Sequence, residues 1–402
     1  MPGSPSARRV GAAVTRRRRC VTPARWAPLE GSALAVALEV LRHGPLSRSD
    51  LARRLDLSRG SLTRLSRPLV DAGLLVELEG PGTSGSRPLD VATGRHRFVG
   101  VKVTADAVHA VATDLRARTL AVREQPLVGT SPADVVEAVA GLVTDLDGDT
   151  TAGGGAPVTA VGVGVGGLVE GRSRVRSARY LRWEDVDLGE LLSDRLGLPV
   201  VVDNDVLSLA RAEQWFGAAG ACDHFAVLTI GEGVGYALVV HDRVVAGPDA
   251  GVGLLGHVPL APTGPTCPLG HVGCADAMLT VGGVEARASV ALRRPVAYAD
   301  VLALAAAGDP AAARVVEDAA RALGRLVALV ANTTMPQKVV VSGDGVALAE
   351  TGRAALLAAV AADRDPRARD VDVDVQAVGF AEWARGAAVT AIQTSVLGSR
   401  VL

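Results

Sequence analysis

The chain of 402 residues is 49% hydrophobic and 21% charged, which excludes a disordered protein and predicts two or three folded domains. Its four cysteines exclude a disulfide-stapled scaffold and favour the reducing cytoplasm. An aromatic content of 3% excludes a protein that binds single-stranded nucleic acid by base stacking, and the net charge of −1, taken alone, argues against any nucleic-acid partner.

The net charge is an average over two segments of opposite sign. Residues 1–100 hold 17 arginines, no lysine and 8 acidic residues, a net charge of +9, whereas the rest of the chain carries −10. The preference for arginine (40 against 2 lysines) explains the type of basic residue but not its clustering. The asymmetry predicts a polyanion partner, double-stranded DNA, for the N-terminal quarter alone.

Residues 1–30 are predicted to form a basic, disordered arm rich in Pro, Ser and Arg. No apolar segment follows the arginines at 16–19, so the arm is not a secretory signal, and no bilayer span is expected elsewhere. The arm would contact DNA phosphates without sequence preference. The alternatives are a solvated tail and a misassigned start site.

Residues 31–92 have the pattern of a winged helix-turn-helix. Apolar spacing predicts helices over 33–41, 48–55 and 59–72, with Pro45 ending the first and serines at 47 and 58 capping the other two. A strand over 74–79, a flexible hairpin tip over 80–86 and a second strand from Leu89 would form the wing. The third helix would enter a major groove.

The apolar side of that third helix leaves a polar face for DNA. We expect Ser61, Thr63 and Arg64 to read bases, while other basic residues position the protein on phosphates or in the minor groove: Arg48, Arg59, Arg67 and Arg87. The alternative is a winged helix that binds protein, which predicts no salt-dependent DNA affinity.

Residues 97–402 have the pattern of a two-lobed α/β body. Strands are expected at 98–103, 108–113, 120–124, 158–165 and 199–202, with helices at 131–145, 188–196 and 206–216. A similar meander recurs at 224–230, 236–240 and 243–245. Two such halves predict a cleft between lobes, near residues 204–257.

Five motifs in this body, taken together, resemble one family. They are the glycine-rich segment 162–169, the Leu-x-Trp segment 181–186, the Asp-Asn-Asp segment 202–206, the Gly-His segment 253–257 and the cysteine loop 267–274. From about residue 33 to its end the chain resembles the ROK family of repressors, open reading frames and sugar kinases. The resemblance implies an actin-like, sugar-kinase-like (ASKHA) body behind the winged helix.

The resemblance also implies a sugar site. Asp205 matches the catalytic base of the kinases, Asn204 the residue that binds sugar hydroxyls, and His257 and Asp276 further ligand residues. The site departs from the family at Leu254, where a glutamate is usual, and Asp276 is one methylene shorter than the usual glutamate. Asn204 and Asp205 can also be interpreted as the cap of a helix, a role that does not exclude sugar binding.

The nucleotide loops depart further from the kinase pattern. Lys102 stands where the first phosphate loop carries an aspartate, Asp106 would face phosphate oxygens, and Glu232 replaces a threonine in the second loop. Without the glycines a nucleotide phosphate can no longer approach the loop backbone closely, and the added carboxylates carry the same negative charge as the phosphate. We therefore expect a non-enzyme; the alternative is an ATP-dependent hexose kinase with an appended N-terminal domain.

The resemblance implies a zinc site with an incomplete ligand set. His257, Cys267 and Cys274 match three family ligands, but Leu269 replaces the fourth, a cysteine. Structural zinc takes four ligands, and His271 could supply the missing one. A metal-free loop with reduced thiols is the alternative.

The sequence thus predicts a cytoplasmic transcriptional regulator, most simply a repressor of carbohydrate metabolism. It would bind a pseudo-palindromic operator as a homodimer or homotetramer. A sugar or sugar phosphate at the degenerate kinase site would shift the lobes and oppose DNA binding.

Overall fold

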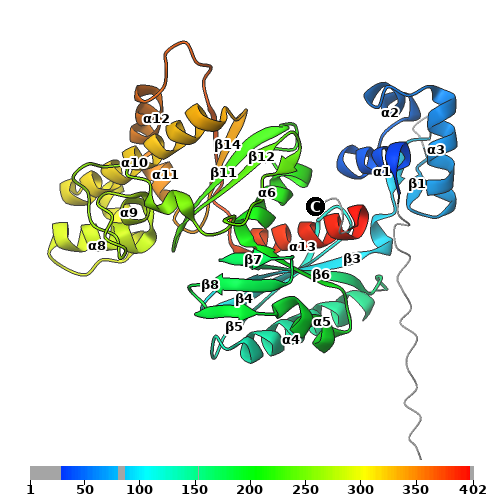
Figure 1. Ribbon diagram of the computed structural model, residues 1–402, viewed down its shortest axis with the longest axis horizontal. Coiled ribbons are helices and arrows are strands. Elements are labelled where there is room, and N and C mark those ends of the chain that lie inside the picture. The colour runs from blue at the N-terminus through cyan, green and yellow to red at the C-terminus, as the bar shows by residue number, and fades with distance from the viewer. Residues whose placement is uncertain (1–28, 80–86, 153, 399–402) are drawn as a thin grey trace, which may run out of the picture.

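The computed structural model describes residues 29–79, 87–152 and 154–398. The expected arm over 1–30 lies almost entirely outside the described residues, and so does the wing tip over 80–86. A small N-terminal head lies at one end of a two-lobed body (Figure 1). No helix in the described ranges is long and apolar enough to cross a bilayer.

The head is a winged helix-turn-helix. Its helices are α1 (Gly31–His43), α2 (Arg48–Arg54) and α3 (Arg59–Asp71), within two residues of the expected bounds. The side chains of Ser47 and Ser58 accept hydrogen bonds from the third backbone amide beyond them, which starts α2 and α3 as the sequence predicts. The wing strands β1 (Leu75–Glu77) and β2 (Leu89–Val91) pair antiparallel, and Leu46 adds a bridge to Leu89.

The first lobe is built on a five-stranded sheet of order β10-β6-β3-β4-β5. Its strands are β3 (Arg97–Val103), β4 (Ala107–Thr113), β5 (Thr119–Pro126), β6 (Val158–Val165) and β10 (Val200–Asn204). The helices α4 (Pro132–Ala152) and α5 (Leu188–Leu196) pack on it. These elements confirm the predicted meander and its alternation with helices.

A three-stranded sheet in this lobe was not predicted. It consists of β7 (Leu168–Glu170), β8 (Arg174–Ala178) and β9 (Trp183–Val186). Such short strands carry too few residues for a period-2 pattern to stand out, and in the β8–β9 turn Arg182 adopts a positive φ, where glycine is the usual signal.

The second lobe carries a sheet of order β13-β12-β11-β14-β15. The strands are β11 (His224–Ile230), β12 (Val234–Val240), β13 (Arg243–Val244), β14 (Lys338–Ser342) and β15 (Asp372–Val375). Its helical layer comprises η2 (Leu254–His257), α7 (Ala275–Leu279), α8 (Val281–Leu292), α9 (Tyr298–Ala306), α10 (Pro310–Thr334), α11 (Ala347–Thr351) and α12 (Arg353–Ala362). The largest apolar core lies between this layer and the sheet.

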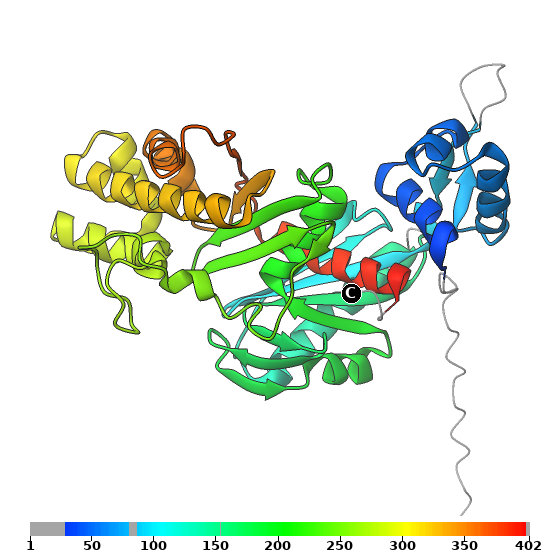
Figure 2. The ribbon, with the colours of Figure 1, turned by 45° about the horizontal axis from the view of Figure 1, so that its top comes forward.

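Two helices lie where the lobes meet. The helix α6 (Asp205–Phe216) packs on the second sheet and on α13 (Phe380–Leu397), and α13 lies on the first sheet (Figures 1 and 2). A Cβ at Gly100 or Gly162 would come within 2 Å of an α13 carbonyl oxygen, so both glycines are needed for this close packing. The head, α6 and α13 share one apolar cluster.

Candidate functional site

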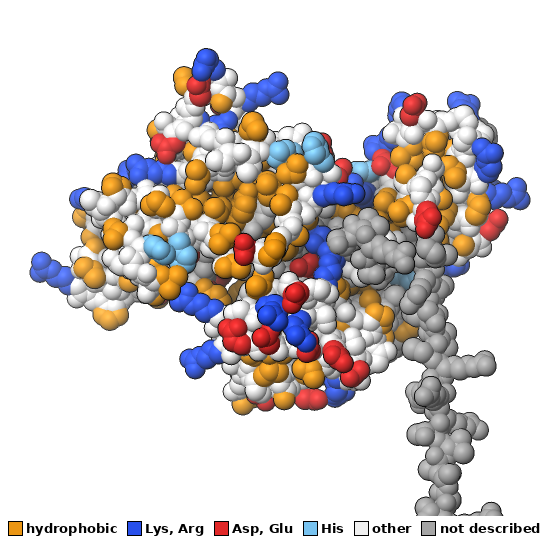
Figure 3. Space-filling view, in the orientation of Figure 1, with side chains coloured by type: hydrophobic (Ala, Val, Ile, Leu, Met, Phe, Trp, Pro, Cys, Tyr) orange, Lys and Arg blue, Asp and Glu red, His pale blue; other side chains and the backbone are white. Residues whose placement is uncertain are grey.

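The outward face of α3 carries arginines without acidic partners. Arg59, Arg64 and Arg67 are exposed, and none of them has an ion pair within the part of the chain that the structure describes. Basic side chains lie along the outer edge of the head, over α2 and α3 (Figure 3). The other two residues predicted to read bases make hydrogen bonds within α3 and its cap. The Ser61 hydroxyl accepts from the Ser58 hydroxyl, and the Thr63 hydroxyl donates to the carbonyl oxygen of Arg59.

The arginines of α2 differ from those of α3, because each has an acidic partner. Arg53 pairs with Asp50, and Arg54 with Glu39, both at 2.7 Å. Among the three helices of the head, the arginines that lack an ion pair within the described residues all lie on α3, the element that a helix-turn-helix inserts into the major groove.

The two remaining candidate DNA contacts meet at the base of the wing. Arg48 hydrogen-bonds Glu77 and the carbonyl oxygen of Arg87, whose own guanidinium lies 3.7 Å from Glu77. The Arg48 hydrogen bond is the main cause that lowers the pKa of the Glu77 carboxyl. Arg48 thus joins α2 to the wing, and Arg87 is 68% exposed beside them.

Asn204, the predicted sugar ligand, is the cap of α6. Its Oδ1 accepts from the amides of Val206 and Leu207 at 2.9 and 3.1 Å, and its Nδ2 donates to the Gly167 carbonyl oxygen at 2.9 Å. The side chain is 3% exposed. Gly251 covers it so closely that a Cβ there would lie 2.8 Å from Nδ2. The interpretation of Asn204 as the cap of α6 is confirmed.

Asp205 is held by a buried cation that the sequence did not reveal as its partner. Lys102 on β3 pairs with Asp205 Oδ2, while Oδ1 accepts from the amide of Val206 at 2.9 Å. Both residues are 7% exposed, and the ammonium lies 5.3 Å from the ring centroid of Trp383. Both carboxylate oxygens of the residue that matches the kinase base therefore already have partners.

A further carboxylate, that of Asp344, lies near this pair, where a nucleotide would be expected. Asp344 lies so close to Gly231 that a Cβ there would be 2.1 Å from its Oδ1. Burial is the main cause that raises the pKa of Asp344, and Asp205 raises it further. The carbonyl oxygen of Glu232 accepts from the Tyr180 hydroxyl at 2.9 Å, a contact from the first lobe to the second. The Asp106 carboxylate accepts a hydrogen bond from the Thr104 hydroxyl at 2.7 Å.

The other predicted ligand residues, His257 and Asp276, form a separate group on the second lobe. Asp276 Oδ2 lies 4.0 Å from His257 Nδ1. Burial is the main cause that raises the pKa of the Tyr180 hydroxyl, and the carboxylates of Asp276 and Asp205, one from each group, raise it further. Sequence reasoning did not single out Tyr180. Leu254, at the position of the family's glutamate, is 64% exposed.

His257, Cys267 and His271 form a cluster that could hold a metal ion, with ligand atoms within 4.8 Å of one another. Cys267 Sγ lies 3.6 Å from His271 Nδ1 and 3.9 Å from His257 Nδ1. Two ligands at Zn–S and Zn–N bond lengths on a tetrahedral ion are about 3.6 Å apart. The donor types and the distance between Cys267 and His271 are those that a bound metal ion such as zinc would need.

A tight turn brings His271 into this cluster, because the Cys267 amide donates to the His271 carbonyl oxygen at 2.9 Å and Gly270 adopts a φ of +90°. Cys274 is buried and contacts Cys267, but the cluster does not include its sulfur. Burial opposes ionisation of Cys267, yet hydrogen bonds from its neighbours, first among them the His271 backbone, lower its pKa to about 6.

Arg116 joins the head to the first lobe, a contact that no sequence signal indicated. It lies in the β4–β5 turn, is 8% exposed, and donates from Nε to the Leu41 carbonyl oxygen at 3.0 Å and from Nη2 to that of Val40 at 2.8 Å. It also pairs with Asp90 of β2. One guanidinium group thus hydrogen-bonds the free carbonyl oxygens at the C-terminal end of α1 and forms an ion pair with a strand of the wing.

Comparisons with known proteins agree with this architecture. A family model described as the ROK family matches residues 98–394. The N-acetylglucosamine repressor of Escherichia coli O6:H1 is 27% identical over 316 residues, covering 75% of this chain and 78% of the repressor. Among solved structures, a ROK family transcriptional regulator, a homologue of the E. coli MLC protein, superposes with a TM-score of 0.77 at 23% identity, covering 92% of this chain and 96% of that one. A ROK hexokinase from Thermus thermophilus has a TM-score of 0.63 at 29% identity, covering 73% and 97%.

Proposed function

Because this chain belongs to the ROK family, we propose that it is a DNA-binding transcriptional repressor that responds to a sugar. The observation that carries the proposal is the face of α3, where three exposed arginines have no acidic partner among the described residues. The repressor relative, which this chain matches over three quarters of its length, supports the same function.

In this proposal α3 lies in the major groove of a pseudo-palindromic operator, and a homodimer or homotetramer supplies two heads. Ser61, Thr63 and Arg64 read bases, and Arg59 and Arg67 contact phosphates. Arg48 and Arg87 place the wing against the adjoining minor groove. The acidic body is repelled by the duplex, so contact is confined to the head.

The effector is a sugar or sugar phosphate that binds between the two groups of ligand residues. Asn204 and Asp205 contact it from one side, and His257 and Asp276 from the other. Because these groups belong to elements on opposite sides of the lobe boundary, ligand binding draws the lobes together. Operator and sugar then oppose each other by linkage.

Kinase chemistry is the second candidate, and the likeness to a hexokinase favours it. The Lys102–Asp205 pair opposes it, since a general base needs a carboxylate oxygen that can accept the proton of the sugar hydroxyl. Incubation with ATP and a panel of hexoses separates the two. We expect no turnover; turnover that Asp205→Asn abolishes would establish a kinase.

The function is tested by selecting duplexes from genomic fragments with the full chain, then adding N-acetylglucosamine, D-xylose or D-glucose. We expect enrichment of a two-fold-related sequence, an affinity that falls steeply with salt, and release by one of the sugars. Retention of no fragment above a protein-free control would contradict the proposal. A protein-binding winged helix predicts that outcome.

We further propose that the cluster of His257, Cys267 and His271 binds one zinc ion with Cys274 completing the set, so that the ion fixes the turn that carries the effector ligand His257. Purified wild type is expected to hold about one zinc per chain, and His271→Ala to lose most of it. Elemental analysis after exhaustive dialysis measures the content. Leu269→Ala, in the same loop, is the control that keeps the metal. Metal-free wild type would refute the site.

A further inference from the structure

The last turn of α1 is attached to both lobes of the body. On one side, Arg116 of the first lobe donates to the carbonyl oxygens of Val40 and Leu41. On the other, Arg42 Nη2 lies 3.5 Å from Asp242 in the β12–β13 turn of the second lobe. Any change in the relative position of the lobes therefore acts on the two sides of this single turn.

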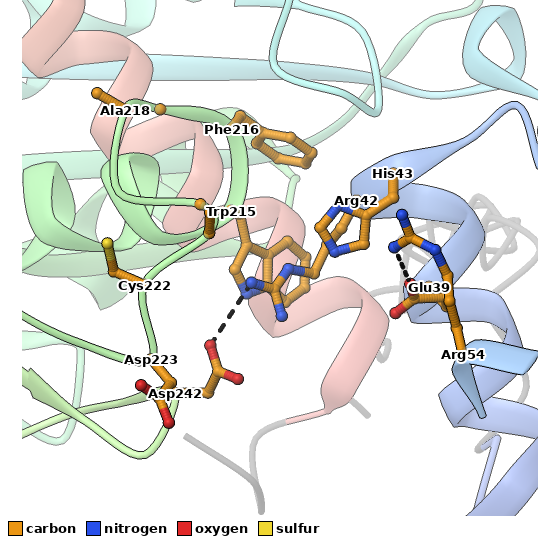
Figure 4. A pocket seen from close by; sticks show the side chains of 13 residues that line it. Glu39, Arg42, His43, Arg54, Trp215, Phe216, Ala218, Cys222, Asp223 and Asp242 are labelled. Atoms are coloured by element: carbon orange, nitrogen blue, oxygen red, sulfur yellow. Dashed lines mark hydrogen bonds and ion pairs between the residues drawn. The ribbon is translucent and has the colours of Figure 1, made fainter. Parts of the chain in front are cut away.

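The two attachments differ in kind. On the first-lobe side the head packs against Phe98, Leu115 and Ala117 in a shared apolar cluster. On the second-lobe side a cavity of about 790 Å³ separates α1 from the segment that follows α6, and the Arg42–Asp242 pair crosses it (Figure 4). Arg42 thus makes a polar contact beside open space, whereas Val40 and Leu41 of the same turn are buried in the apolar cluster that the head shares with the first lobe and α6.

The helix α6 connects this contact to the effector site. It begins at Asp205, is capped by Asn204, and every residue from Asp205 to Trp215 is buried. At its other end the Gln214 carbonyl oxygen accepts from Arg42 at 3.2 Å, and the Gln214 side-chain amide donates to the Asp242 carbonyl oxygen. A buried helix moves as a unit, so a shift at Asn204 reaches Arg42 directly.

We propose that Arg42 transmits the effector signal: α6 and Asp242 pull on the last turn of α1 through Arg42, while Arg116 holds that turn to the first lobe as the pivot. The inference rests on the proposed function and names the residue through which it is regulated. A sugar that draws the lobes together turns α1, and with it α3, relative to the body.

Two single variants and a charge exchange test this. Arg42→Ala removes the contact to α6 and Asp242. Arg54→Ala is the matched control, because Arg54 lines the same cavity but pairs with Glu39 inside the head, as Figure 4 shows. Arg42→Glu combined with Asp242→Arg restores an ion pair of opposite polarity. Operator fragments come from the selection above, and the probe is the sugar among N-acetylglucosamine, D-xylose and D-glucose that releases them.

The measured quantity is the factor by which the sugar weakens operator binding, with sugar affinity measured separately by calorimetry. Couplings of this kind are about 5- to 150-fold. We expect wild type and Arg54→Ala to show a weakening of operator binding by the sugar in this range. In Arg42→Ala the sugar should weaken operator binding less than about 2-fold, although the affinity for the sugar itself is unchanged. The variant with the exchanged pair should recover part of the wild-type factor. If the sugar weakens operator binding by Arg42→Ala as much as by wild type, this inference is overturned but the proposed function is not. A wild type without any sugar response overturns the proposed function and this inference with it.

Discussion

Replacing Lys102 by alanine is expected to lower the free energy of unfolding by about 3–5 kcal/mol, because it leaves the Asp205 carboxylate buried without its cation. Asp205 is 7% exposed and lies at the start of α6, on which both lobes pack. Urea unfolding of the full chain, followed by circular dichroism, measures the change.

The only other lysine of the chain provides the matched control. Lys338 pairs with Asp372 at 2.9 Å, but that aspartate is 60% exposed, so Lys338→Ala should cost less than about 1 kcal/mol. Lys102→Met combined with Asp205→Leu should recover most of the loss, since neither charge then remains buried. Equal effects of the two alanine variants would show that the Lys102–Asp205 pair is solvated.

Replacing Arg64 and Arg59 by alanine should have different consequences for DNA binding. Loss of Arg64, on the polar face of α3, is expected to weaken the selected operator by about 1–3 kcal/mol and to relax the preference for its bases. Arg59→Ala should weaken all duplexes alike and reduce the slope of log affinity against log salt by about 1.

Titration of labelled operator and of a scrambled duplex at several salt concentrations separates the two effects. Arg53→Ala is the control, because Arg53 is exposed on the neighbouring helix but already paired with Asp50. It should change both affinities less than either α3 variant. Equal losses on operator and scrambled duplex for Arg64→Ala would overturn the assignment of Arg64 to base reading.

The head and most strands could be predicted from the sequence because their signals are local. Ser47 and Ser58 cap helices that begin at the next residue, and Pro45 follows the end of α1. Most strands of the two five-stranded sheets have six or more residues, enough for an apolar strand to be recognised from the sequence. The paired Asn-Asp at 204 and 205 likewise predicted the start of α6.

The partners of buried charges could not be predicted, because they depend on register between distant segments. Lys102 was interpreted only as the loss of an aspartate; it meets Asp205 because β3 and β10 both pair with β6 in parallel, which brings their ends together. Arg116 lies about 75 residues from the carbonyl groups it satisfies, in a turn with no motif. His271 could be named as a candidate metal ligand because it lies between two cysteines of one short loop, and the structure places it in the cluster with His257 and Cys267.

The most direct test of the account is a measurement of linkage in both directions. The full chain is titrated with operator at saturating sugar and in its absence, and with sugar at saturating operator and in its absence. Coupling through one shared conformational change requires that the two factors be equal and larger than one. The account predicts equal factors of at least about 5, lost together in Arg42→Ala. Factors of one in wild type, with both ligands bound at once, would contradict it.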